Sequence, residues 1–158
     1  EKYCFDNVED SCSKYGGLYE WNEIMQYVET EGTQGICPTG WHIPTIGEFE
    51  VLADEVGDKL NDNPTYSGGN ALKAIGQGWD DNTSDNGIGT NTSGFSALLG
   101  GNRNIPYGNF EYFGSGTRFW SSSNDDGPKN ISLGGSHDYI GFSSSGSSWG
   151  FSVRCIKD

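Results

Sequence analysis

Aromatic side chains are the feature that most constrains how this chain can fold. Its 158 residues include 5 Trp, 8 Tyr and 8 Phe, although hydrophobic residues of all kinds make up only 33% of the sequence. A charged chain with so few aliphatic residues approaches the composition of disordered proteins, but this many large rings require a core that buries them. The 25 glycines supply many turn positions. The sequence therefore predicts a small aromatic core surrounded by many turns.

The net charge argues against two classes of partner. Asp and Glu number 22 against 9 Lys and Arg, which gives a formal charge of −13. Nucleic-acid binding depends on Lys and Arg that neutralise phosphates, and anionic membrane surfaces attract the same side chains. No stretch approaches the roughly 18 apolar residues of a transmembrane helix. We therefore expect no nucleic-acid partner and no direct membrane insertion, and the length predicts one domain over residues 1–158.

The four cysteines form an even set, Cys4, Cys12, Cys37 and Cys155. None of them forms the CxxC pair typical of zinc sites, and only two histidines are present. This pattern favours disulfides over reduced structural thiols or a metal site, and disulfides indicate an oxidising, extracytoplasmic compartment. Because the chain starts at Glu1 with no leader-like segment, we expect a mature secreted chain or a piece of a longer protein.

Two helices are predicted in the first third of the chain. The first spans residues 17–31, where apolar residues recur at helical spacing before Gly32. The second spans residues 45–57, where Thr45 and Glu48 form a T-x-x-E capping box. A short third helix is predicted over residues 70–75. The apolar positions of the first two helices are Leu18, Trp21, Met25 and Val28, then Phe49, Leu52, Ala53 and Val56.

The second half of the chain predicts short strands and long loops. The stretch 79–92 is a polar loop, and strands are expected over residues 95–99, 110–113, 118–122, 131–133, 139–142 and 150–156. Helices followed by strands indicate an α+β class with an antiparallel sheet rather than alternating β/α units.

Motifs for catalysis are incomplete. His42, between Trp41 and Ile43, favours a structural hydrogen-bonding role, and the G-x-S-x-G match at residues 146–150 lacks the helix that must follow it. The loop from Asp80 through Asp81 to Asp85 offers several oxygens to calcium but fails the EF-hand template, because Asp85 stands where glycine is required. No other cofactor is expected, and calcium at this loop remains an alternative to a solvated loop.

Five separated motifs resemble the Fibrobacter succinogenes major paralogous domain family, which occurs on exported bacterial proteins. They are Tyr15-Gly-Gly-Leu-Tyr-Glu-Trp21, Cys37-Pro-Thr-Gly-Trp-His-Ile-Pro-Thr45, Gly94-Phe-Ser-Ala-Leu-Leu-Gly-Gly-Asn-Arg103, Phe119-Trp-Ser-Ser-Ser123 and Gly150-Phe-Ser-Val-Arg-Cys155. Phe49 and Leu99 depart from the family's usual Trp and Pro, but both remain apolar. The Gly-Trp-x-x-Pro-Thr-x-x-Glu stretch also resembles formylglycine-generating enzymes, which places the chain in the C-type lectin-like superfold.

The resemblance implies a C-type lectin-like fold, with two N-terminal helices packed on a short-stranded antiparallel sheet and long irregular loops. It also implies disulfides Cys4–Cys12 and Cys37–Cys155, the second tying the region before the 45–57 helix to the final strand. Formylglycine-generating enzymes carry a close cysteine pair late in the chain, where this sequence has Cys155 alone, and related sulfoxide synthases need more histidines than His42 and His137. We therefore expect no enzyme activity.

The function expected from these features is ligand binding, as an adhesin-like domain at the surface of a bacterium or phage. A retroelement-diversified variable protein and a pilus-tip module are specific versions of this role; a structural surface component or a formylglycine-generating-enzyme-like oxidase are the alternatives. The partner is expected to be a protein or glycan, because the C-terminal loops combine aromatic and small polar residues as antibody paratopes do. The expected contact residues are Tyr112, Asn124, Asp125, Asp126, Asn130, His137, Asp138, Tyr139 and Trp149, with Trp149 also a candidate for the core.

Overall fold

The structure is a computed structural model that describes residues 1–60, 65–82 and 86–158. Within this part of the chain, short helices and strands are joined by long irregular segments, and the predicted α+β class is confirmed. The helical elements are η1 (Phe5–Asn7), α1 (Glu9–Tyr15), α2 (Trp21–Ile24), α3 (Ile46–Val56) and α4 (Gly69–Leu72). The strands are β1 (Lys2–Tyr3), β2 (Leu18–Tyr19), β3 (Trp41–His42), β4 (Thr65–Tyr66), β5 (Gly100–Arg103), β6 (Phe110–Phe113), β7 (Gly116–Trp120), β8 (Lys129–Gly134), β9 (Ile140–Ser144) and β10 (Ile156–Lys157).

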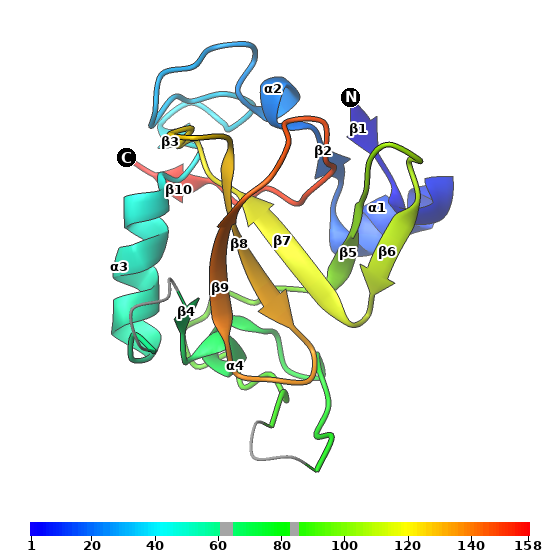
Figure 1. Ribbon diagram of the computed structural model, residues 1–158, viewed down its shortest axis with the longest axis vertical. Helices are drawn as coiled ribbons and strands as arrows, with labels where there is room; N and C mark the ends of the chain where they lie inside the picture. Colours follow the sequence, from blue (N-terminus) through cyan, green and yellow to red (C-terminus); the bar gives the residue numbers. More distant parts are fainter. Residues whose placement is uncertain (61–64, 83–85) are drawn as a thin grey trace.

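A six-stranded sheet lies at the centre of the molecule, with strand order β4-β9-β8-β7-β5-β6 (Figure 1). Its longest ladders join β8 to β7 and β8 to β9. The predicted antiparallel arrangement is confirmed for every neighbouring pair in this sheet but one, since β5 and β7 run parallel with Gly101 opposite Thr117. The exception arises because β5 and β6 form a hairpin and β7 then lies on the other side of β5.

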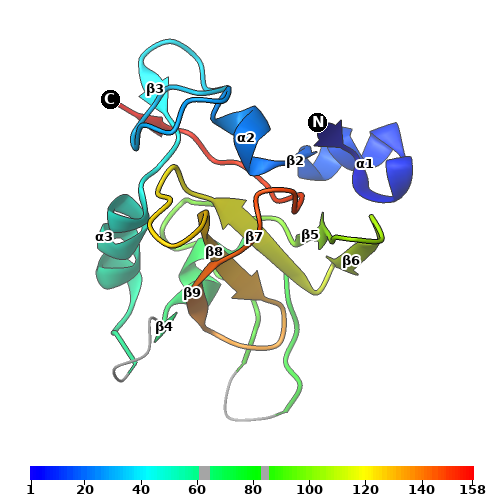
Figure 2. The same ribbon diagram turned by 45° about the horizontal axis from the view of Figure 1, so that its top comes forward.

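Helix α3 packs on one face of the sheet, toward the β4 edge, while α1 lies near β5 and β6 (Figures 1 and 2). Helix α3 begins at the predicted capping box. The Glu48 amide donates to Thr45 Oγ1 (3.1 Å), and the Thr45 amide donates to the Glu48 carboxylate (2.8 Å). Its buried residues Phe49 and Ala53 belong to a core cluster that includes Ile131 on β8. The sequence prediction of this helix is confirmed.

On the opposite face of the sheet, a second core cluster covers one end. Side chains alternate between faces along β7, so Phe119 enters the α3 cluster while Trp120 enters a second cluster with Trp21 and Phe151. The indole Nε1 of Trp120 donates to the Tyr19 carbonyl (2.8 Å), which satisfies its buried N–H. Toward Gly116, at the other end of β7, this face remains uncovered by the second cluster.

The helix predicted over residues 17–31 is wrong in length. Residues 18–19 form β2, and α2 has a single turn that buries Trp21 and Ile24. The backbone then turns at Gln26 (φ 51°) and Tyr27 (φ 60°), which ends the helix. Helical spacing of apolar residues continues only as far as Met25, because Tyr27 and Val28 are exposed. Helix α1 was not predicted, since it has no buried residue to give it an apolar stripe.

Three other predicted elements are shorter or displaced. The third helix, α4, spans residues 69–72 instead of 70–75. In the strand predicted over 95–99, Ala97 and Leu99 are buried, but Ser96 has φ 57° and only Ala97 makes a bridge, so β5 starts at Gly100. In the strand predicted over 150–156, each of residues 150–152 bridges a different partner, and a regular ladder returns only in β10. Strand β6 matches its prediction, and β7, β8 and β9 are shifted or extended by one or two residues.

The two predicted disulfides, Cys4–Cys12 and Cys37–Cys155, are both present. The second joins segments that also pair through β3 and β10, with Ile156 opposite His42. The Asp158 amide donates to the Gly40 carbonyl (3.1 Å). The end of the chain is therefore held to the segment before α3 by one covalent bond and by a strand pair.

Candidate functional site

Six of the nine residues predicted to contact a ligand lie in two groups at opposite ends of β8, while Tyr112 lies in β6, Asn130 within β8 and Trp149 after β9. Residues 124–126 belong to the β7–β8 connection, whereas residues 137–139 belong to the β8–β9 connection (Figure 1). The six residues of β8 separate the two groups by about 17–20 Å at the usual rise of a strand. The single surface expected from the sequence is therefore divided into two regions.

Two of these residues have structural roles. Asn130 is fully buried, and its Oδ1 accepts hydrogen bonds from Arg118 Nη1 (3.0 Å) and Ser143 Oγ (2.9 Å). The expectation that Asn130 lies at the recognition surface is corrected by this burial. The Asp138 carboxylate accepts from the amide of Asn70 (2.6 Å) and more weakly from Gly68 (3.2 Å), which anchors the start of α4.

The remaining residues of the two groups differ in exposure. Asn124, Asp125 and Asp126 are exposed. The Tyr139 ring is half-buried and stacks on the ring of His137, with 5.1 Å between centroids. Trp149 is also half-buried and packs on Phe151 beside the second core cluster, which agrees with the core position that the sequence allowed for it.

A hollow of about 300 Å³ brings Tyr112 and His137 together over the uncovered end of the sheet. It lies between β6, the Gly116 end of β7, the Gly134 end of β8 and the start of the β8–β9 connection. We call it the β6–β8 hollow. Its lining residues are Asn102, Tyr112, Ser115, Gly116, Thr117, Arg118, Ser132, Leu133, Gly134, Ser136 and His137.

Two glycines leave this part of the sheet without side chains of its own. Gly116 lies opposite Gly134 in the β7–β8 ladder, and on the same face Arg118 lies opposite Ser132. A Cβ on Gly134 would lie 2.3 Å from His137 Nε2, so the imidazole can rest against the strand only because no side chain is present there. The paired glycines therefore leave room for the His137 imidazole on Gly134 and for the Tyr112 side chain next to Gly116.

Tyr112 is well placed to meet a partner. Its side chain is 61% exposed, and its φ of 63° lies in the left-handed region that aromatic residues seldom adopt. Strain of this kind persists only where the surrounding structure imposes it, and it is frequent at binding sites. The neighbouring ring of Phe113 packs on Phe5 and Tyr15, which fixes the strand while leaving the Tyr112 ring outside.

Two residues that line the β6–β8 hollow have buried polar atoms. Asn102 is 2% exposed and Thr117 is 3% exposed. Within the described residues, Asn102 Nδ2 and Thr117 Oγ1 are buried without a hydrogen-bond partner. A buried polar group that stays unpaired costs about 1–3 kcal/mol. Thr117 shares the Phe119 face of β7, opposite Arg118, so its hydroxyl is not offered to a ligand beside the guanidinium.

Arg118 contributes the positive charge of the hollow. Its Nη1 donates to Asn130 and to Ser143 Oγ (3.1 Å), both neutral groups. Burial lowers the pKa of Arg118 below its usual value, although the guanidinium remains charged at neutral pH. None of the described residues that line the hollow is Asp or Glu, so the site is locally positive in a protein whose formal charge is −13.

Lys73 fixes the connection that carries His137. This side chain is fully buried, and its Nζ donates to the carbonyls of Gly87 (2.6 Å), Gly134 (2.7 Å) and His137 (2.8 Å). Burial lowers the pKa of Lys73 to about 8, and the Asp138 carboxylate opposes that shift. The ammonium therefore predominates at pH 7 and ties three separate segments at one wall of the hollow.

The candidate calcium residues lie in another region. Asp80 and Asp81 are exposed in the loop after Trp79, and Asp85 lies outside the described residues. The Asp80 Oδ1 accepts from the Asn82 amide (2.8 Å), which closes a turn. Among the residues that the structure describes, no group of three or more His, Cys, Asp or Glu is placed to hold a metal ion.

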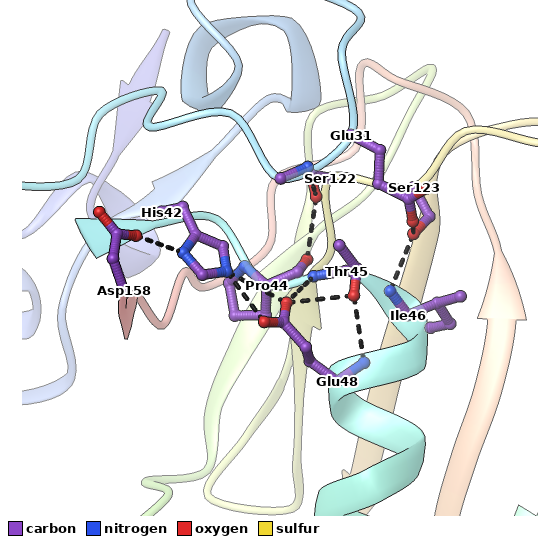
Figure 3. Close-up of polar contacts among 10 residues, drawn as sticks. Glu31, His42, Pro44, Thr45, Ile46, Glu48, Ser122, Ser123 and Asp158 are labelled. Carbon is purple, nitrogen blue, oxygen red and sulfur yellow. Dashed lines mark hydrogen bonds and ion pairs between the residues drawn. The ribbon is translucent and has the colours of Figure 1, made fainter. Parts of the chain in front are cut away.

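A second polar cluster surrounds His42 at the start of α3 (Figure 3). The imidazole Nδ1 lies 2.7 Å from the Asp158 carboxylate, and Nε2 lies 3.0 Å from Glu48. Hydrogen bonding to Asp158 raises the pKa of His42; burial opposes this shift, and Glu48 adds to it. Because both ring nitrogens contact carboxylates, this histidine joins the chain end to α3, in line with its predicted structural role.

The same cluster connects α3 to the serines that follow β7. Ser122 Oγ accepts from the Gly32 amide (2.9 Å) and donates to the Pro44 carbonyl (3.3 Å). Ser123 Oγ accepts from the Ile46 amide (2.8 Å) and donates to the Glu31 carboxylate (Figure 3). These hydroxyls are occupied by internal bonds, so the cluster holds elements together.

The fold and the hollow define a disulfide-bonded α+β domain with a small polar depression on the open part of its sheet. The chain belongs to the Fibrobacter succinogenes major domain family, whose model matches residues 1–157. No curated protein and no solved structure matches the chain. The disulfides are consistent with a secreted domain. In the described ranges, no helix has the length and apolarity needed to cross a bilayer.

Of the residues that line the hollow, the sequence pointed to Tyr112 and His137 as ligand contacts but not to Asn102, Thr117 or Arg118. The alternation along residues 117–120 could have pointed to Arg118, since it lies between Thr117 and Phe119 and therefore faces the opposite side of the sheet. Asn102 and Thr117 give no such signal. Both line the hollow because β5 pairs in parallel with β7, with Gly101 opposite Thr117.

Proposed function

We propose that this domain is a non-catalytic, adhesin-like binding module of an exported bacterial or phage surface protein, and that its ligand occupies the β6–β8 hollow. The observation that carries the proposal is the guanidinium of Arg118, which lines that hollow. Among the described residues Arg118 forms no ion pair, and its two hydrogen-bond acceptors are neutral side chains. We also propose that the fold belongs to the C-type lectin-like superfold, in which rigid sheets commonly support binding loops.

The surrounding structure supports a preformed site. Lys73 fixes the β8–β9 connection, and the β7–β8 ladder fixes the floor. A preformed site loses little entropy on binding, so a small contact area can still give useful affinity. The exposed group Asn124, Asp125 and Asp126 lies at the other end of β8 and is proposed as a separate contact region for a larger partner.

The test is binding of the domain to glycan and protein arrays, followed by comparison of single variants. Tyr112→Ala is expected to weaken binding at least tenfold with little change in melting temperature, because the ring is mostly exposed. Glu55→Gln, on the exposed part of α3, is the matched control and should bind as the parent does. A ligand lost in Glu55→Gln but retained in Tyr112→Ala would place the site elsewhere, and no ligand on either array would favour a structural surface component.

The retroelement-diversified version of this role has its own test. A near-copy of the coding segment close to the gene, differing mainly at adenines, would support it. Substitutions should then fall on exposed positions such as Tyr112 and Asn124 and spare Asn130, whose buried amide is needed by the sheet. Absence of such a copy would remove this version and leave an invariant or pilus-tip module.

A further inference from the structure

The chemistry of the β6–β8 hollow points to an anionic ligand. Arg118 is half-buried, and within the described residues its only hydrogen-bond acceptors are the neutral side chains of Asn130 and Ser143. Both bonds use Nη1, so the Nη2 and Nε side of the guanidinium has no hydrogen-bond partner in that part of the chain. A guanidinium edge of this kind accepts a carboxylate through two parallel hydrogen bonds.

The rest of the lining is suited to a sugar ring. Ser115, Ser132 and Ser136 line the hollow together with Gly116 and Gly134. The His137 imidazole already rests on Gly134, so the space for a ligand lies beside it, where the exposed Tyr112 ring offers a face for stacking. The hollow is about 300 Å³, at the lower end of ligand pockets, and so fits a small group better than a folded protein surface.

We infer that the β6–β8 hollow binds a saccharide that carries a carboxylate, with the carboxylate on Arg118 and the sugar ring against Tyr112. This inference rests on the proposed function and names the ligand class of the same site. The negative charge of the whole chain adds to its specificity, because 22 acidic residues repel anions from most of the surface and the hollow is free of them within its described lining.

The experiment is an NMR titration in which the amide chemical shifts of the isotope-labelled domain are monitored as each probe is added. The probes are methyl glucuronide, methyl galacturonide and N-acetylneuraminate, with methyl glucoside and methyl galactoside as neutral partners of the first two and acetate as a carboxylate without a sugar. At least one acidic sugar is expected to bind at least tenfold more tightly than its neutral partner and than acetate. The largest shifts should fall on the amides of Gly116, Gly134 and their neighbours.

Arg118→Gln should remove the preference for the acidic sugar and leave weak binding of the neutral one. This variant is expected to fold, because Asn130 Oδ1 keeps its bond from Ser143 Oγ, and its melting temperature verifies that. Tyr107→Ala, an exposed tyrosine outside the hollow, is the matched control and should keep the parent affinities.

Four results would overturn the inference. Equal affinity for acidic and neutral sugars, or binding of acidic sugars to Arg118→Gln as tightly as to the parent, would refute the role of Arg118 while leaving the proposed binding function in place. Acidic sugars that bind but shift amides outside the hollow would refute both the inference and the proposed location of the ligand. If neither these probes nor any ligand on the arrays binds, the proposed function fails together with the inference.

Discussion

Replacement of Lys73 by Met tests whether one buried cation organises the wall of the β6–β8 hollow. Methionine has a similar length and no charge, so the cavity stays filled while three carbonyls lose their donor. Each buried carbonyl left unpaired costs about 1–3 kcal/mol, and burial of the apolar methionine side chain offsets part of the summed cost of the three carbonyls. We expect a net loss of about 3 kcal/mol in the free energy of unfolding.

The measurement is urea unfolding at about pH 7, below the pKa of about 8 to which burial lowers Lys73. For a domain of this size, a loss of about 3 kcal/mol corresponds to a melting temperature lower by about 6–12 °C. Lys157→Met removes the same charge from an exposed position and should change stability by less than about 0.5 kcal/mol. If the two variants are equally stable, the reasoning on the Lys73 carbonyl contacts is refuted.

Three further predictions concern the covalent bonds, the His42 cluster and calcium. Replacing both Cys37 and Cys155 by Ala should lower the free energy of unfolding by about 5 kcal/mol, because their bond joins residues 118 apart in sequence. Removing the Cys4–Cys12 bond, with a separation of 8, should lower it by about 2.5 kcal/mol. Equal losses in urea unfolding would contradict the loop-length argument. Because the pKa of His42 is raised in the folded state, its protonation stabilises the fold fully at pH values below the unfolded pKa near 6.5, and this effect is lost as the pH rises through the folded pKa. His42→Gln should therefore lower the free energy of unfolding more at about pH 5.5 than at about pH 8.5. A loss that does not depend on pH would argue against the ion pairs. Excess calcium and a chelator should give the same melting temperature, since Asp80 bonds within its own turn; a calcium-dependent rise would place an ion in that loop.

The elements that the sequence predicts well are those specified by neighbouring residues. Helix α3 combines a capping box with an apolar stripe, and both its ends agree with the pattern. The helix predicted over 17–31 is too long because only Trp21, Ile24 and Met25 are buried at helical spacing, over a single turn. The next residues of the pattern are exposed, so no core contact extends the helix. The strand predicted over residues 150–156 is wrong for a different reason, since each of residues 150–152 bridges a different strand.

The candidate site was predictable only in part. Aromatic and polar residues such as Tyr112 and His137 can be selected by type, but which of them meet depends on strand order. The parallel pairing of β5 with β7 places Gly101 opposite Thr117 and brings β5 to the hollow, and no local pattern predicts such a pairing. Burial also removes Asn130 from the surface, because its amide is required to join β8 to Arg118 and to β9.

The Cys37–Cys155 bond has a mechanical consequence. A pulling force applied to the two ends of this chain would pass from residue 37 to residue 155 through the covalent bridge. Once residues 1–36 have been pulled away from their hydrogen bonds to the segment between the two cysteines, the backbone of that segment, with the sheet and the hollow, would carry no tension. The extension would come from residues 1–36 and 156–158, less the length closed by the Cys4–Cys12 bond. The binding face of the domain would thus keep its shape under tension for as long as the disulfide stays oxidised.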